Sequence, residues 1–236
     1  MQTAVLSGYG NTSSGVSSVV CGGGSYGSYS YSANTSSGQS SFVGAGWGNV
    51  GSGFGASVLG GANSTANGSY SAVLSGAYAS TRGILGYTVF GASNLPLGST
   101  SASSQAALLV LGKQTTDATA TVITSDGGAA SGTNQVILPN NSAYYFRGEI
   151  IAGVTGAGDT KGWYIEGVIK RGAGVGTTAI VGTATVTSLY ADVGASTWAV
   201  TALADTTNGG LKITVTGQAS TTIRWVAQIR TTEMTY

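Results

Sequence analysis

The chain contains no histidine, one cysteine and two prolines, and only 7% of its 236 residues are charged. The lack of histidine excludes catalysis and metal binding that depend on an imidazole. A single cysteine cannot form an internal disulfide. We expect Cys21 to be a small apolar residue stacked in the interior, because no histidine is present to activate it or to share a metal with it.

Clustered positive charge is also missing. The net charge is +1, and Lys170–Arg171 is the one basic pair, so the chain offers little to a phosphate backbone. The longest apolar run, residues 106–111, is too short to cross a bilayer, and the first ten residues lack the charged and apolar parts of a secretion signal. We therefore expect a soluble protein with no nucleic-acid partner and no membrane insertion.

Glycine is abundant and regularly spaced in the first half. Two series of glycines recur every fifteen residues. The first is Gly38, Gly53, Gly68 and Gly83, and the second, eight residues later in each coil, is Gly46, Gly61, Gly76 and Gly91. Gly15 and Gly23 are also eight residues apart. The fifth residue after the anchor glycine is Val20, Val43, Val58, Val73 or Thr88, and the third is Ser18, Ser41, Ala56, Ser71 or Gly86. Fixed positions of this kind are typical of the stacked strands of a β-solenoid, whereas a disordered linker needs none.

One coil of this repeat carries an insertion. Fifteen residues separate Gly23 from Gly38 where the later coils have seven, and the added stretch includes Tyr26 and Tyr29. Insertions in solenoids loop out to one face, which is often the binding face. We predict that these tyrosines form an aromatic surface together with Trp47 or Phe54, the alternative being that they pack against a neighbouring chain.

The second half predicts strands and turns without helix. Eight segments rich in β-branched and aromatic residues are separated by Gly, Asn, Asp and Pro: residues 120–124, 134–138, 143–153, 161–171, 177–191, 197–204, 210–217 and 221–234. In the last segment Ile223 and Trp225 alternate with Arg224 and Val226, which predicts a sheet buried on one face. Eight such strands favour a β-sandwich of jelly-roll type.

A change in composition divides the chain. Arg82 is the one charged residue before Lys113. We predict a solenoid over residues 1–95, a connector over 96–115 and a β-sandwich tip over 116–236.

Both halves resemble parts of virion and adhesin proteins. The segments "SSFVGAG" (40–46), "ASVLGG" (56–61) and "SAVLSG" (71–76) resemble the head repeats of YadA-like trimeric autotransporter adhesins and the repeats of bacteriophage tail fibres. The segments "TNQVILPNNSAYYFRGEIIAG", "GWYIEGVIKRG", "ADTTNGGLKITVTG" and "TIRWVAQIRTTEMTY" resemble the C-terminal β-sandwich of phage tail fibres. The resemblance implies a homotrimeric virion appendage that touches the host surface, and it brings no catalytic motif.

The thin coils independently favour a trimer. A fifteen-residue coil buries few apolar side chains, each ordered residue costs about 1–2 kcal/mol of backbone entropy, and buried apolar area returns only about 25 cal/mol per Å². Packing three copies around an axis would add burial.

Carboxylates are the remaining candidates for catalysis. Glu149 and Glu166 lie on predicted neighbouring strands, as the two acids of a glycosidase would, but pairing with Arg147 and Lys170 on a solvated face explains them better. Asp159 and Asp192 are explained by turn chemistry, so we expect no metal and no cofactor. The sandwich loops with Asp159, Lys161, Asp192 and Trp198 compete with the tyrosine insertion as the ligand site.

These observations predict a phage tail fibre or tailspike-like protein that adheres to a bacterial surface glycan without catalysis and contacts other virion proteins. A capsid decoration fibre and a polysaccharide depolymerase are the alternatives.

Overall fold

The computed structural model describes residues 2–24, 32–98 and 100–236, and it is all-β apart from two short 3-10 helices, η1 (Val175–Thr177) and η2 (Val193–Ala195). Among these described residues, no helix has the length and apolarity needed to span a membrane. The chain divides into two compact units, one comprising residues up to Ala107 with Met234–Tyr236 and the other comprising Leu108–Glu233. The boundary falls inside the strand β11 (Ser104–Thr115), which occupies the second half of the predicted connector.

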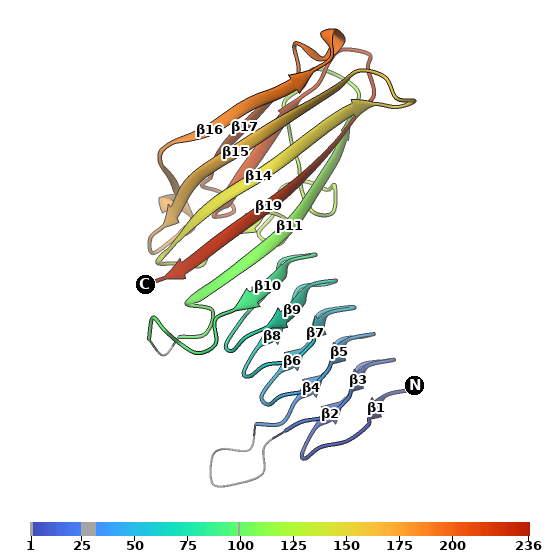
Figure 1. Cartoon of the computed structure of the whole chain (residues 1–236), viewed down its shortest axis with the longest axis vertical. Helices are drawn as coiled ribbons and strands as arrows, with labels where there is room; N and C mark the ends of the chain where they lie inside the picture. Colours follow the sequence, from blue (N-terminus) through green and yellow to red (C-terminus); the bar gives the residue numbers. More distant parts are fainter. Residues whose placement is uncertain (1, 25–31, 99) are drawn as a thin grey trace. The chain divides into compact units, whose positions relative to one another are not determined.

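Unit 1 is a β-solenoid of about five coils (Figure 1). One parallel sheet is formed by β1 (Ala4–Val5), β3 (Val19–Val20), β5 (Phe42–Val43), β7 (Ser57–Val58), β9 (Ala72–Ser75) and β10 (Thr88–Gly91). A second is formed by β2 (Thr12–Ser13), β4 (Thr35–Ser36), β6 (Val50–Gly51) and β8 (Thr65–Ala66). Equivalent residues of successive coils pair in register, which confirms the predicted stacking.

The interior of the solenoid holds one valine per coil and a ladder of polar side chains. Val20, Val43, Val58, Val73 and Val89 are fully buried. Asn34 and Asn49 are fully buried as well, and each donates from its side-chain amide to two backbone carbonyls while its Oδ1 accepts the backbone N–H of the equivalent residue in the next coil, Asn49 or Ser64. Because a thin coil leaves backbone groups without partners in its own strands, these amides supply the missing hydrogen bonds.

Close contact between coils explains the periodic glycines. A Cβ atom added to Gly46 would lie 1.9 Å from the carbonyl oxygen of Gly61, and Gly46 has a φ of +93°. A Cβ on Gly38 would lie 2.1 Å from the carbonyl oxygen of Gly53. Any side chain at these corners would therefore push the coils apart.

The last coil departs from the predicted frame by one residue. Val73 pairs with Val89 rather than with Thr88, and the backbone of Gly68 meets Ile84 rather than Gly83. As a result Tyr87, which is fully buried, takes the position predicted for Gly86. Burial of Val89 and Tyr87 sets the register here, whereas the fifteen-residue glycine spacing does not.

Cys21 is half-buried rather than interior. The equivalent residue two coils later, Leu59, is exposed, because this position follows the inward-facing valine and points to the other face of the strand.

Unit 2 contains two antiparallel sheets. The larger has the order β11, β19 (Ile223–Thr235), β14 (Ser142–Val154), β15 (Thr160–Arg171) and β16 (Ala179–Ala191) (Figure 1). In the smaller, β18 (Gly210–Thr216) pairs with β17 (Ala199–Asp205) on one side and with β12 (Thr121–Val122) and β13 (Val136–Ile137) on the other. All eight segments predicted as strands contain one.

Three buried tryptophans of unit 2 pack against one another. Trp225 of β19 lies 5.5 Å from Trp163 of β15 and 5.9 Å from Trp198, which directly precedes β17, measured between ring centroids. The Trp225 Nε1 donates to the Thr115 hydroxyl at 2.9 Å. The predicted alternation in β15 and β19 is confirmed, since Trp163, Ile165, Trp225 and Ala227 are buried.

Candidate functional site

The tyrosines of the predicted insertion site, Tyr26 and Tyr29, lie outside the described residues. Trp47 is exposed and stands beside the two points where the inserted stretch leaves and rejoins the coil. Gly24 donates its backbone N–H to the Gly46 carbonyl at 2.8 Å, and Gly48 donates to the Ser32 carbonyl at 2.9 Å. Trp47 is therefore exposed next to the described residues on either side of the inserted stretch, and its predicted grouping with Tyr26 and Tyr29 stays a prediction.

Phe54 is exposed as well, but it follows Gly53, whereas Trp47 follows Gly46, so the two aromatic residues lie at different corners of the coils. Its ring packs edge to face on Tyr70, with centroids 5.2 Å apart. The structure thus gives Phe54 an aromatic partner from the next coil and does not join it to Trp47.

Two of the four residues predicted in the sandwich loops are buried. Lys161 donates from Nζ to the carbonyls of Trp198 at 2.8 Å and Ser196 at 3.2 Å, and its ammonium lies 5.2 Å from the ring of Trp163. Trp198 is buried against Trp225. The expectation that Lys161 and Trp198 present their side chains to a ligand needs correction, because both hold the two sheets together.

Asp159 and Asp192 are exposed at one end of unit 2. Asp192 accepts the backbone N–H of Thr160 at 2.9 Å, and its own backbone N–H donates to the Thr160 carbonyl at 3.0 Å. A Cβ on Gly194 would lie 1.9 Å from the Asp159 carboxylate. The hydrogen bonds of Asp192 assign it to loop structure, and the Asp159 carboxylate lies close to the backbone of Gly194.

Asp205 is a second case of turn chemistry. Its carboxylate accepts the backbone N–H groups of Thr207 and Asn208 at 2.9 and 3.0 Å and the side-chain amides of Asn208 and Gln135 at 2.8 and 3.0 Å. Burial raises the pKa of Asp205, but these hydrogen bonds outweigh it and the net pKa is lowered. In the described part of the chain, no three His, Cys, Asp or Glu side chains come together in a way that could hold a metal ion.

The outward face of the larger sheet carries two tyrosines and a glutamate, Tyr145, Tyr164 and Glu166, which we call the tyrosine–glutamate cluster. The Tyr145 hydroxyl donates to Oε1 of Glu166, and the Tyr164 hydroxyl donates to Oε2 at 2.9 Å. Strand register brings them together, since Glu166 and Tyr164 are two residues apart on β15 and Tyr145 lies on β14 opposite Val168. One carboxylate is thus clamped between two phenols on an open surface.

The hydrogen bonds of the cluster fix its protonation. Donation from Tyr145, then from Tyr164, lowers the pKa of Glu166, so its carboxylate is ionised at neutral pH. The same hydrogen bonds favour the protonated phenols. They raise the pKa of Tyr145 to about 12, and the pKa of Tyr164 is raised as well, the bond to Glu166 being the largest cause for each.

Charged residues surround the cluster. Arg147 lies directly opposite Glu166 in the β14–β15 register, and Glu149 lies opposite Tyr164. The predicted neighbourhood of Arg147 and Glu166 is therefore confirmed, whereas Lys170 lies opposite Ala143, away from both glutamates. Sequence reasoning considered Glu149 and Glu166 but missed Tyr145 and Tyr164, although the alternation of β14 and β15 assigns both tyrosines to the outward face.

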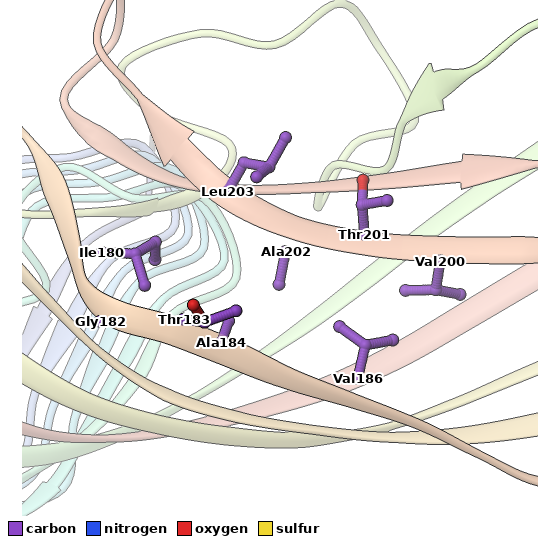
Figure 2. Close-up of a pocket in the computed structure, with 9 residues that line it drawn as sticks. All are labelled: Ile180, Gly182, Thr183, Ala184, Val186, Val200, Thr201, Ala202 and Leu203. Carbon is purple, nitrogen blue, oxygen red and sulfur yellow. The ribbon is translucent and has the colours of Figure 1, made fainter.

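A separate cleft of about 460 Å³ lies between β16 and β17. Figure 2 shows Val200 and Ala202 of β17 pointing toward Ala184 and Val186 of β16, while Thr201 and Leu203 point away. No charged residue lines this cleft, and of its two threonines, Thr183 and Thr201, the second points away from it. Such a lining suits apolar packing better than recognition of a sugar.

Comparison with known proteins finds structural neighbours among phage tailspikes. No protein-family model and no curated protein matches the sequence. The tailspike protein gp49 of Acinetobacter baumannii bacteriophage Fri1, a capsular polysaccharide depolymerase, matches with a TM-score of 0.30 and 9% identity over 98% of this chain and 44% of its own. The A. baumannii phage AM24 tailspike matches with a TM-score of 0.27, 11% identity, and coverage of 97% and 56%.

The tailspike of Acinetobacter phage vB_ApiP_P1 matches with a TM-score of 0.20 and 9% identity over 99% of this chain and 56% of its own. This chain thus spans about half the length of the tailspikes it matches. TM-scores this low do not establish a common fold, so the functional argument rests on the residues of this chain.

Proposed function

We propose that this chain is a receptor-binding protein of a phage tail fibre or tailspike-like appendage, which acts as a homotrimer and adheres to a bacterial surface glycan without cleaving it. In this proposal unit 1 is a YadA-like shaft or head, unit 2 is a β-sandwich tip, and the protein is carried on the virion. The sequence resemblance of both halves supports the assignment to an appendage. The tyrosine–glutamate cluster supports the choice of a glycan as the ligand.

The cluster has the chemistry that recognises sugar hydroxyls. An ionised carboxylate keeps acceptor sites free beyond the two that the tyrosine hydroxyls occupy, and each phenol oxygen can still accept a hydrogen bond. Hydrogen bonds to a charged acceptor are about twice as strong as neutral ones. Since Tyr145 and Tyr164 already hold Glu166 in place, a ligand would bind a rigid group and lose little side-chain entropy. This arrangement is the observation that carries the proposal.

A depolymerase is the second candidate, because Glu149 and Glu166 lie on the same face of neighbouring strands, one diagonal step apart. Diagonal neighbours across a sheet are separated by roughly 7–8 Å, within the range of roughly 6.5–9.5 Å for an inverting glycosidase. A glycosidase also needs one of its acids protonated, with a raised pKa. Two phenol donors keep Glu166 ionised, which argues against a general-acid role for this carboxylate, and the sequence resemblance brings no catalytic motif, so we favour adhesion.

Binding to host cells or to a glycan array tests the proposal. We expect the double variant Tyr145→Ala, Tyr164→Ala to bind at least about tenfold more weakly than the unmodified chain, because a tenfold change corresponds to only about 1.4 kcal/mol, less than two or three lost hydrogen bonds to the ligand contribute. Two matched double variants, Phe54→Ala with Tyr70→Ala and Tyr26→Ala with Tyr29→Ala, remove as many rings from the solenoid and from its insertion.

Unchanged binding by the Tyr145, Tyr164 variant, with loss in one of the other two, would transfer the site to unit 1. Incubation of a bound glycan with the protein separates adhesion from cleavage. A steady chain length supports adhesion, whereas released oligosaccharides that disappear in Glu149→Gln would establish the depolymerase instead.

A further inference from the structure

The edge of unit 2 at β16 combines three features that are unusual for a surface in contact with water. The strand is thirteen residues long, several of its exposed residues are large and apolar, and the sequence from Gly172 to Ala191 contains no charged residue. A strand of this length extends about 43 Å, about twice the usual length.

Among the strands that the structure describes, β16 has β15 as its one neighbour and ends the larger sheet. Natural proteins protect exposed edges with lysine, proline or very short strands. In the smaller sheet, β12 and β13 are two residues long. By contrast β16 contains neither lysine nor proline, and its register shifts against β15 are the one protective feature present.

Apolar exposure is concentrated at this edge. Tyr190 and Val193 are 85% and 93% exposed, and Val181 and Leu189 of the same strand are 48% and 51% exposed. Elsewhere on the larger sheet, some exposed apolar residues have a charged neighbour on the same face of their strand, as Val226 has in Arg224 and Tyr145 has in Arg147. Apolar surface without interspersed charge is typical of an interface between proteins.

The cleft between β16 and β17 extends this edge toward the smaller sheet. Ala184 and Val186 on one side and Val200 and Ala202 on the other leave an apolar space of about 460 Å³ between the two strands. Since Thr201 points away from this space, a glycan would find few side-chain hydrogen-bonding groups in it. The backbone groups along an edge strand can instead pair with another polypeptide.

We propose that the open edge of unit 2, formed by β16, the residues up to Val193 and the cleft beside β17, is the contact surface between copies of this chain. A second copy is the matching occupant because it presents the same uncharged edge, so no charge on either side is buried unpaired. The proposal rests on the homotrimer in the proposed function and gives it a location: the uncharged edges of three copies meet around the threefold axis, and the tyrosine–glutamate cluster stays on the exposed face.

The test compares two double variants of the full chain that add the same charge. Val181→Lys with Leu189→Lys alters the open edge. Val110→Lys with Val226→Lys alters β11 and β19 of the same sheet at residues that are 53% and 49% exposed. Light scattering and sedimentation velocity at micromolar concentration report the molar mass, and circular dichroism reports the fold.

We expect the unmodified chain and the β11–β19 variant to sediment as oligomers of equal mass, and the β16 variant to dissociate at a concentration at least tenfold higher. Equal masses for both variants and the unmodified chain would overturn the proposal while leaving glycan binding, which is measured separately, untouched. A monomeric unmodified chain that still bound glycan would likewise refute the interface but not the adhesion.

Hydrogen exchange on the unmodified chain gives a readout that does not depend on how a variant folds. Diluting the protein through its dissociation range should speed exchange of the amides in residues 179–193 and leave those of β14 unchanged. Exchange in β16 that stays constant while other segments respond would place the contact elsewhere and disprove the assignment.

Discussion

Replacing Asn49 with alanine should lower the free energy of unfolding by about 3 kcal/mol, because three hydrogen bonds of about 1 kcal/mol each are lost in a fully buried position. The side-chain amide of Asn49 donates to the carbonyls of Ala45 at 2.9 Å and Gly61 at 3.0 Å, and its Oδ1 accepts the Ser64 backbone N–H at 3.1 Å. Alanine removes the side-chain partner of all three backbone groups, although the Gly61 carbonyl still accepts the Trp47 backbone N–H at 3.3 Å.

Two further variants of the same residue sharpen this prediction. Asn49→Asp keeps the acceptor but places a carboxylate against two carbonyl oxygens, so it should destabilise more than alanine does. Asn49→Ser should be intermediate, since Ser64 occupies the next position of the ladder and its hydroxyl accepts the Ala79 backbone N–H at 3.2 Å.

Urea unfolding followed by circular dichroism measures the change at one fixed protein concentration. Gln39→Ala is the matched control, because it truncates an exposed amide of the same solenoid and should alter stability by less than about 0.5 kcal/mol. A loss for Asn49→Ala that is no greater than that of the control would refute the view that the amide ladder stabilises the coils.

Two more predictions concern the phenols and the corner glycines. The pKa of Tyr145 is raised to about 12 from 10.0, so its hydrogen bond to Glu166 adds stability that is fully present below pH 10 and is lost as the pH rises through about 12. In an absorbance titration of the phenolates, the step near pH 12 should disappear in Tyr145→Phe and move to lower pH in Glu166→Gln. A titration that is unchanged in both variants would contradict the cluster. Gly46→Ala should destabilise the chain by more than about 2 kcal/mol, because the new Cβ meets the Gly61 carbonyl oxygen and φ is +93°. Gly132→Ala is the control and should be nearly neutral, because nothing lies within 4 Å of its Cβ position. Equal melting temperatures for the two variants would contradict the close stacking.

The repeat in unit 1 could be predicted because the contact between coils leaves a trace in the sequence. Backbone atoms of neighbouring coils meet at Gly38 and Gly46, so no other residue fits there and the spacing is visible. The last coil could not be aligned in the same way. Its register is set by burial of Tyr87 and Val89, and a tyrosine in a position held elsewhere by serine or alanine cannot be anticipated from spacing.

The ladder asparagines show a second limit. Asn34 and Asn49 read as ordinary loop residues, and nothing in the sequence states that their amides point inward, because their partners are backbone groups of other coils. By contrast, the alternation of apolar and polar residues in β15 and β19 correctly predicted which of their side chains are buried.

The candidate site depended on pairing between strands. Tyr145 and Glu166 are brought together by the register of β14 and β15, and one step of slippage would have separated them. Lys161 and Trp198 were expected to be exposed because they border loops. A long lysine side chain can instead reach two carbonyl groups inside the fold, which residue type alone does not reveal.

The amide ladder also determines how the length of unit 1 can vary. Between Gly38 and Gly76 each coil contributes fifteen residues and one ladder position, so residues 46–60 could be removed with the Oδ1 of Asn34 meeting the Ser64 N–H in place of Asn49. A deletion that is not a whole number of coils would take the valines and the glycines of neighbouring coils out of register. Unit 1 can therefore be lengthened or shortened by duplication or loss of whole coils, in steps of about 4.8 Å, without a change in its core.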